Sequence, residues 1–337
     1  MSQQQNISRR IWLKQAFTQS LGIAGVLHGG LIPQQPAFSQ QPKKVDSAPT
    51  LLLRSGWQTV NIGDIGHSPG ILKLLELYAP DFQIILWPNS VDRGVEPMLK
   101  KRFPHLKIVK GRLRTDGTLD SESLEQAFQQ ADFFLHGSGP SVVSRRELAH
   151  WKQATGKPYG IYGVTVSEIN PELHRLLSGA DFIFTRETHS LKNLSEAKIT
   201  SANQDFAPDA TFAIDLTDDP KTQEFQRQNQ LEKGKYLCAV PRLRFTPYHK
   251  IHKSTRWSTE KIREVESVNQ QYQEIDHAKL RAAIIKWVRT TGQKVVVCPE
   301  MTYQTEIIHP LVIDPLPADV KSQVVAHDHY WLPDEAG

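Results

Sequence analysis

The 337-residue chain contains only two cysteines, Cys238 and Cys298. Each lies inside a hydrophobic run typical of a strand, where cysteine usually behaves as a small buried hydrophobe. A disulfide between them would require neighbouring strands whose Cβ atoms point suitably toward each other. We therefore do not expect these two cysteines to form a disulfide.

The sequence also lacks a long hydrophobic run and a dense basic stripe. Its apolar N-terminal stretch, residues 16–32, is interrupted by Gln19 and His28. This stretch is too short and too mildly hydrophobic for a stable transmembrane helix. The formal net charge is +4, and part of it comes from the N-terminal region. These absences argue against an integral membrane span and against a nucleic-acid-binding surface.

No glycine-rich stretch has the spacing of a P-loop or of a dinucleotide fingerprint. Residues 51–77 combine three leucines, a loop containing Gly56, Gly63 and Gly66, and a helical pattern from Ile71. A strand, a glycine loop and a helix N-terminus form a natural anion site. We expect a phosphate or carboxylate group here rather than ATP or NAD, and no cofactor. The alternative is a strand–helix turn that binds nothing.

The N-terminus resembles a twin-arginine export signal. Arg9 and Arg10 precede the apolar stretch, and Ala37-Phe38-Ser39 forms a cleavage site of small residues. This pattern predicts a signal peptide over residues 1–39, a linker over 40–49 and export to the periplasm. An ordinary basic amphipathic N-terminus is the alternative.

Strand and helix patterns alternate over residues 50–217, which predicts an α/β domain with a doubly wound, mostly parallel sheet. Residues 218–234 are polar and indicate an interdomain linker or an exposed helix. A second α/β pattern covers residues 235–337. Within it, the basic and aromatic insert at 246–274 is predicted to be a mobile lid or solvated loop, followed by a helix over 276–291.

Ligands of such sheets bind at the carboxyl ends of the strands. Four predicted loops at this edge carry polar residues or glycines. His136 could instead be a satisfied strand-end histidine, and Arg186-Glu187 a surface ion pair. The candidate residues are Asn61, Gly63, Asp64, His136, Gly137, Ser138, Gly139, Thr185, Arg186, Glu187, Pro208 and Asp209.

Several short motifs occur in one characteristic order. They are NIGD at 61–64, HGSGP at 136–140, FTRE at 184–187, APDATF at 207–212 and VPRLR at 240–244. Together they are similar to the polysaccharide pyruvyl transferase family. The resemblance implies an α/β protein with two Rossmann-like domains facing a cleft, as in GT-B glycosyltransferases. It also implies transfer of a pyruvyl group from phosphoenolpyruvate to a pair of sugar hydroxyls in a glycan acceptor.

Two departures from the family pattern are present. The family has an all-glycine loop where this chain has His136-Gly137-Ser138-Gly139, and its late Arg/Met-His element does not follow Glu335. We therefore expect the second domain to be incomplete and the sequence to be C-terminally truncated.

The chemistry of phosphoenolpyruvate explains the residue types. Its phosphate and carboxylate suit bidentate arginines, and Arg242 and Arg244 would share one side of an extended strand end. Pyruvyl transfer needs an acid and a base, for which Asp64, Glu187 and Asp209 are candidates, with His136 as a proton shuttle. Substrate-binding roles are expected for Asn61, Gly63, Gly137, Ser138, Gly139, Arg186, Arg242 and Arg244.

Other functions also fit these patterns. One is a GT-B glycosyltransferase with a nucleotide-sugar donor, and another is an exported, non-catalytic protein that binds a sugar or an anion. His327 and His329 form a His-x-His pair, but a loop or strand-end role is favoured over a metal site. We expect no metal, and the sequence does not indicate the acceptor sugar or the oligomeric state.

Overall fold

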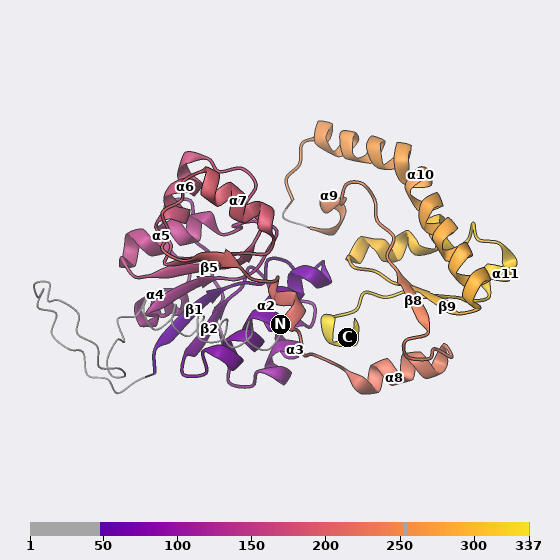
Figure 1. The fold of residues 1–337 in the computed structure, drawn as a ribbon, viewed down its shortest axis with the longest axis horizontal. Helices are drawn as coiled ribbons and strands as arrows, with labels where there is room; N and C mark the ends of the chain where they lie inside the picture. Colours follow the sequence, from indigo (N-terminus) through magenta and orange to yellow (C-terminus); the bar gives the residue numbers. More distant parts are fainter. Residues whose placement is uncertain (1–47, 253–254, 337) are drawn as a thin grey trace, which may run out of the picture. The chain divides into compact units, whose positions relative to one another are not determined.

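The computed structural model describes residues 48–252 and 255–336 (Figure 1). The predicted signal peptide, residues 1–39, and most of the predicted linker, residues 40–47, lie outside the described residues. The chain divides into two compact units. The first runs to Trp57 and continues over Gly66–Val91 and Leu99–Asp215, and the second comprises Gln58–Ile65, Asp92–Met98 and the chain from Leu216 onward.

The first unit is built on a seven-stranded parallel sheet with the order β3-β2-β1-β4-β5-β6-β7. The order reverses between β1 and β4, which places a topological switch point, the usual ligand position of open α/β sheets, at their carboxyl ends. The strands are β1 (Thr50–Arg54), β2 (Gln83–Trp87), β3 (Lys107–Ile108), β4 (Phe133–His136), β5 (Tyr159–Val164), β6 (Phe182–Thr185) and β7 (Gln204–Phe206).

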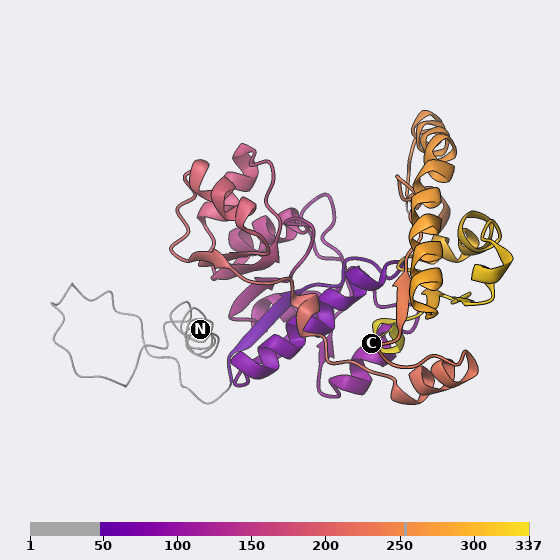
Figure 2. The ribbon, with the colours of Figure 1, turned by 45° about the vertical axis from the view of Figure 1, so that its right-hand side comes forward.

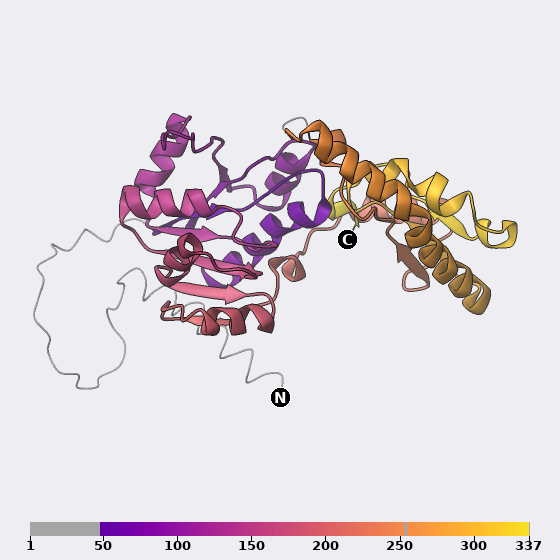
Figure 3. The same ribbon diagram turned by 90° about the horizontal axis from the view of Figure 1, so that it is seen from above.

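Both faces of this sheet are covered. Neighbouring residues of one strand point to opposite faces, and both are buried. Leu52 and Phe134 lie opposite each other and pack in one large apolar cluster. Leu51 and Phe133 point to the other face and are also fully buried. Figure 3 shows helices of this unit on both sides of the sheet. They are α4 (Glu122–Gln130), α5 (Arg145–Thr155), α6 (Pro171–Ser178) and α7 (Thr188–Glu196), with parts of α2 (Ile62–Tyr78) and α3 (Val95–Arg102) and the short η1 (Ala210–Ala213).

The glycine loop predicted before Ile71 is largely helical, so this expectation was wrong. Helix α2 already begins at Ile62, because the Asn61 side chain accepts hydrogen bonds from the Gly63 and Asp64 amides at 2.7 and 3.3 Å and so caps the helix. The glycines within α2 permit close packing. A Cβ atom on Gly70 would lie 2.0 Å from the Ala210 carbonyl oxygen.

The second unit contains a three-stranded parallel sheet with the order β10-β9-β8. Its apolar cluster lies between this sheet, α10 and η3. The strands are β8 (Tyr236–Ala239), β9 (Lys294–Val297) and β10 (Val324–Ala326); the helical segments are α8 (Asp219–Gln228), α9 (Tyr248–Ile251), α10 (Thr259–Thr291), η2 (Thr302–Glu306), η3 (Ile308–Ile313), α11 (Ala318–Lys321) and α12 (Pro333–Ala336).

Three expectations about the second unit can be compared with the structure. The predicted insert at 246–274 is only partly a loop, because α10 begins at Thr259 after its cap Ser258 and spans 33 residues (Figure 2). The polar segment 218–234 contains α8, which has no buried side chain. Both cysteines are free thiols, but only Cys298 is buried. Cys238 is exposed, so the expected burial was wrong for that residue. Over the described ranges, no helix combines the length and the apolar character needed to cross a bilayer.

Candidate functional site

The predicted site residues fall into two polar clusters, one in each unit, which are described separately. The first cluster lies at the carboxyl edge of the seven-stranded sheet. There β4 ends at His136, β6 ends at Thr185, and the chain after β7 reaches Asp209. Parallel strands bring their carboxyl ends to one edge, so these segments lie together although they are distant in the sequence.

His67 of α2 is the centre of this first cluster. Its Nδ1 atom lies 2.7 Å from Ser138 Oγ and 3.1 Å from Asp209 Oδ1. An ionised carboxylate can only accept a hydrogen bond. We therefore place the proton between His67 and Asp209 on His67 Nδ1. Both partners meet the same nitrogen, whereas in a Ser-His-Asp relay they meet opposite nitrogens. Ser138 Oγ also accepts the Ala210 amide at 3.2 Å. The arrangement cross-links α2, the β4 loop and η1.

Asp209 is the most heavily bonded acid of the cluster. Arg186 Nη1 donates to Asp209 Oδ2 at 2.8 Å, and the Thr211 amide and hydroxyl donate to Oδ1 at 3.0 Å each. Burial alone raises the pKa of Asp209, but the hydrogen bonds from His67, Thr211 and Arg186 outweigh it and hold this pKa well below its ordinary value. Asp209 therefore stays ionised and anchors Arg186.

The glycine loop after β4 uses its amides within the protein. The Gly137 amide donates to the Arg54 carbonyl at 2.9 Å, and the Gly139 amide donates to the Gly163 carbonyl at 3.2 Å. Trp57 donates through Nε1 to the Ser138 carbonyl at 2.8 Å. A Cβ atom on Gly139 would lie 2.8 Å from that indole nitrogen. The two glycines here serve backbone pairing and close packing, and their amides are not available to an anion.

His136 is completely buried, and both of its ring nitrogens are engaged. Its Nδ1 donates to the Gly137 carbonyl at 2.7 Å, and its Nε2 accepts the Ser144 amide at 3.3 Å, just before α5. Burial lowers the pKa of His136 to about 3, aided by the nearby charge of Arg54. This geometry favours a neutral, structural imidazole and gives no path for the proton shuttle that the sequence suggested.

Glu187 is the N-cap of α7. Its carboxylate accepts the Ser190 amide at 2.8 Å and also bonds the Ser190 hydroxyl. Burial raises the pKa of Glu187, but these bonds outweigh it, so the pKa is lowered overall. Arg186 is oriented by a second bond, from its Nε to Thr165 Oγ1 at 2.8 Å. Arg186 and Glu187 therefore have separate partners and do not form a surface ion pair with each other.

The second cluster, in the second unit, joins Asn61 to Arg242 through Glu300. Asn61 Nδ2 lies 3.3 Å from Glu300 Oε1, and Arg242 Nη1 lies 3.4 Å from Glu300 Oε2. The backbone supports this contact, because the Ile62 amide donates to the Glu300 carbonyl at 3.0 Å. The structure thus brings the NIGD segment and Arg242 together within one unit.

Asp64 belongs to the same cluster through Gln58, whose side-chain amide donates to it. Gln58 Oε1 lies 3.0 Å from His252 Nε2. The Tyr330 hydroxyl is buried and has no hydrogen-bond partner within the described residues. Burial raises the pKa of Tyr330; the charge of Arg93 opposes this rise, and the charges of Asp64 and Glu300 add to it. Tyr330 therefore remains a protonated phenol in an acidic setting.

Arg244, predicted to act together with Arg242, has different partners. It pairs with Asp276 of α10 at 2.8 Å, and its guanidinium lies 3.5 Å from the centre of the Tyr272 ring. Both arginines are largely exposed, with 59% of the Arg242 side chain and 41% of the Arg244 side chain accessible. The structure therefore places only Arg242 with the NIGD segment.

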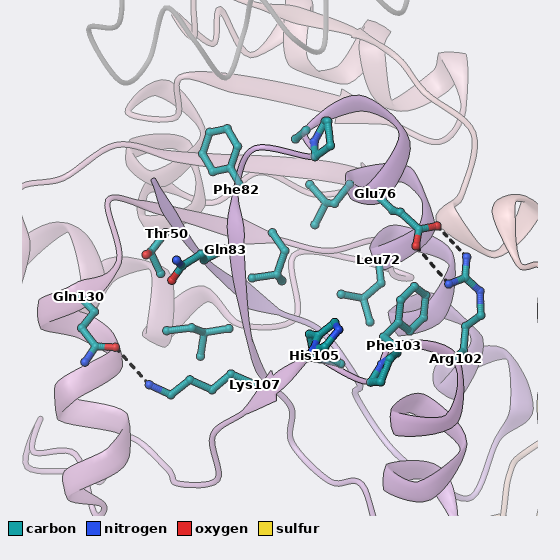
Figure 4. A pocket seen from close by; sticks show the side chains of 17 residues that line it. Thr50, Leu72, Glu76, Phe82, Gln83, Arg102, Phe103, His105, Lys107 and Gln130 are labelled. Atoms are coloured by element: carbon teal, nitrogen blue, oxygen red, sulfur yellow. Dashed lines mark hydrogen bonds and ion pairs between the residues drawn. The ribbon is translucent and has the colours of Figure 1, made fainter. Parts of the chain in front are cut away.

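Two other features lie apart from these clusters. A hollow of about 590 Å³ in the first unit is lined by Thr50, Gln83 and Lys107, each the first residue of its strand (Figure 4). It therefore opens at the amino edge of the sheet, opposite the predicted site residues.

Within the ranges 48–252 and 255–336, no group of three or more His, Cys, Asp or Glu side chains could hold a metal ion. His327 contacts the His329 carbonyl through Nδ1.

Sequence reasoning missed His67, Thr165 and Glu300. His67 lies three residues after Asp64, which is helical spacing, but this stretch was expected to be a loop. Glu300 lies three residues after the end of β9, a correctly predicted strand, which was a usable signal. Thr165 carried no signal, because its role depends on Arg186 lying beside it.

Comparison with solved structures shows the fold. A structure of S. aureus MnaA with UDP matches with a TM-score of 0.50 at 12% identity, covering 84% of this chain and 69% of that chain. Anabaena Alr3699/HepE in complex with UDP matches with a TM-score of 0.44 at 9% identity, covering 83% and 68%. E. coli ADP-heptose LPS heptosyltransferase II matches with a TM-score of 0.39 at 13% identity, covering 86% and 75%. The match at a TM-score of 0.50, together with the seven-stranded parallel sheet, confirms the predicted α/β, Rossmann-like fold of GT-B type.

A search of curated proteins by sequence gives no match. The family model for polysaccharide pyruvyl transferase, in contrast, matches residues 61–326. This range contains every residue predicted for the site, from Asn61 to Arg244, and most of the described chain. The chain therefore belongs to the polysaccharide pyruvyl transferase family.

Proposed function

We propose that this protein transfers the pyruvyl group of phosphoenolpyruvate to two hydroxyls of one sugar in a glycan, forming a cyclic ketal. The observation that carries the proposal is the family match over residues 61–326. Support also comes from the second cluster, where a largely exposed arginine, two carboxylates and a protonated phenol are gathered in one unit.

The reaction balances without an oxidant or a reductant. Both sugar oxygens form bonds to C2 of phosphoenolpyruvate, the C2–O bond to phosphate breaks, and the methylene carbon C3 gains one proton and becomes a methyl group. One hydroxyl proton is balanced by the proton that C3 gains, and the other leaves with inorganic phosphate. The protein must therefore bind a dense anion, accept a hydroxyl proton and protonate a carbon.

The second cluster offers a residue for each task. Arg242 has a single ion pair at 3.4 Å and a 59% exposed side chain, so it can also bind a carboxylate or phosphate. Asp64 would accept the hydroxyl proton. Tyr330, whose buried hydroxyl has no hydrogen-bond partner within the described residues, would donate a proton to C3. Arg186, held by Asp209 and Thr165 in the first unit, is a second candidate for anion binding.

The test is release of inorganic phosphate from phosphoenolpyruvate in the presence of a glycan acceptor, with mass spectrometry of the ketal. Asp64→Asn should lower kcat about 10²- to 10⁴-fold. Arg242→Gln should weaken phosphoenolpyruvate binding about 10- to 100-fold, as expected for a charge-assisted hydrogen bond. Arg289→Gln is the matched control, because Arg289 pairs with exposed Asp319 at 3.0 Å outside the cluster.

Calorimetric titration separates this function from its alternatives. Phosphoenolpyruvate should bind saturably to the wild-type chain. Binding of a nucleotide sugar but not of phosphoenolpyruvate would contradict the proposal and favour a glycosyltransferase. Binding of glycans without phosphate release would favour a non-catalytic binding protein.

We also propose that the protein is exported through the twin-arginine pathway, from Arg9-Arg10 and the apolar stretch that follows. In fractionated cells the native chain should be shortened and periplasmic, whereas the chain with Arg9→Lys and Arg10→Lys should remain full-length in the cytoplasm. A native chain that stays uncleaved in the cytoplasm would contradict this proposal.

A further inference from the structure

A second, smaller hollow lies at the carboxyl edge of the first sheet. It has a volume of about 250 Å³ and is formed by the loops after β4 and β5 together with the first residues of α5 and α6. Thr165 lines it and accepts the bond from Arg186 Nε at 2.8 Å. Arg186 in turn holds Asp209, so the hollow adjoins the first polar cluster. All of its lining belongs to the first unit.

The lining carries several hydrogen-bonding groups that the described residues leave unused. Arg145 donates through Nε to the Val142 carbonyl at 3.3 Å, and its two terminal nitrogens have no partner in the described part of the chain. In those same ranges, the hydroxyls of Ser141 and Ser167 and the carboxylate of Glu168 also have no hydrogen-bond or ion-pair partner. Donors and acceptors are therefore both available to a ligand.

The charge of the lining argues against an anionic ligand. Arg145 contributes one positive charge and Glu168 one negative charge, so the hollow has no net charge. Its remaining wall is aliphatic, from Val142, Val166 and Leu173, each 2% exposed. Glu168 would repel a phosphate or a carboxylate, whereas neutral hydroxyl groups can bond both charged side chains.

The size of the hollow limits the ligand to a single ring. Sites for drug-sized molecules occupy about 300–1,000 Å³, and the present volume lies below that range. A nucleotide would not be enclosed. A hexose, with hydroxyls around its edge, matches the unused donors and acceptors of the lining.

We propose that this hollow binds one neutral hexose residue of the glycan acceptor, with Arg145 and Glu168 bonding the sugar hydroxyls. The proposal rests on the proposed function only in taking the ligand from a glycan acceptor. Because Thr165 bonds Arg186, the second candidate for anion binding, the site would hold the sugar close to that residue.

The experiment is ligand-observed NMR titration of the full chain with methyl glycosides of neutral hexoses, and separately with inorganic phosphate. Arg145→Gln and Glu168→Gln should each weaken hexoside binding about 10-fold, as expected for loss of a hydrogen bond to a charged group. Arg146→Gln is the control, because the neighbouring Arg146 is exposed and donates to the Arg114 carbonyl at 2.9 Å, outside the hollow. Glu168 is exposed, so its variant should fold normally.

Hexoside binding that is weakened by both variants and unaffected by the control would support the site. No hexoside binding, or binding that both variants retain in full, would overturn it. Phosphate binding that falls with Arg145→Gln and rises with Glu168→Gln would also overturn it, because the hollow would then be an anion site. Phosphate release from phosphoenolpyruvate is measured on the same samples. A protein that binds hexosides but does not turn over phosphoenolpyruvate would refute the proposed function and leave the hexose site standing.

Discussion

Asp209 in the first unit and Arg244 in the second both form charged pairs, yet their surroundings differ. The Asp209 side chain is 12% exposed and is bonded by His67, Arg186 and Thr211. The Arg244 side chain is 41% exposed and pairs with one acid, Asp276. Water can replace the partner of an exposed charge but not that of a buried one, so the same kind of contact should differ several-fold in its effect on stability. The following predictions test this comparison.

The largest effect is expected for Asp209→Ala. Removing this carboxylate leaves the largely buried His67 and Arg186 without their acidic partner, so the free energy of unfolding should fall by about 3–5 kcal/mol. Chemical denaturation followed by circular dichroism measures the loss. Asp205→Ala is the control, because the exposed Asp205 side chain bonds only the Phe206 amide within the described residues. This substitution should cost less than about 1 kcal/mol. Equal losses for the two substitutions would show that burial does not strengthen the contacts of Asp209.

Gly70→Ala should lower the free energy of unfolding by about 3 kcal/mol, since its Cβ would lie 2.0 Å from the Ala210 carbonyl oxygen and must displace η1. The same denaturation assay applies. Gly66→Ala should be milder, because the nearest atom to its Cβ, at 2.9 Å, is the terminal methyl of Ile214, which can rotate away. If the two alanines proved equally costly, the close approach of α2 to η1 would be wrong.

The stability of the first unit should fall with acid through His136. Its folded pKa of about 3 lies below the ordinary value of 6.5, so the unfolded chain takes up this proton first. The contribution is complete above pH 6.5 and is lost as the pH falls toward 3, by up to about 1.4 kcal/mol per pH unit.

Unfolding free energies measured between pH 7 and pH 4 should therefore show a shallower slope for His136→Gln than for the wild-type chain. His105→Gln changes an exposed histidine and should keep the wild-type slope. An unchanged slope in the His136 variant would show that the ring is not buried in its neutral form.

The smallest effect is expected for Arg244→Ala. Its exposed pair with Asp276 and its contact with Tyr272 should contribute little to stability, and less at high salt than at low salt. Denaturation at low and at high ionic strength measures this contribution. A loss as large as that of Asp209→Ala would remove the contrast between the two units.

Alternation of hydrophobic runs and helical patterns was enough to predict most elements of the first unit. The runs around Leu52, Phe134 and Ile183 became buried parallel strands, because a strand covered on both faces must be apolar at every position. The prediction failed at the start of α2. The glycines there predict a loop, whereas Asn61 caps a helix in which Gly70 permits contact with η1. That contact joins residues distant in the sequence, so no local pattern could indicate it.

For the site, the short motifs were sufficient to place the chain in its family and to select residues that reach the strand ends. The sequence by itself determined the fold class and the polar character of these loops, because hydrophobic periodicity and residue chemistry are local properties. Only the tertiary structure decided which polar groups are already occupied. Burial and hydrogen bonding give His136 a structural role and make Glu187 the N-cap of α7. Contacts across the fold join Glu300 to Asn61 and Thr165 to Arg186. A side chain's partners depend on what packs around it, and that is set by the folded chain as a whole.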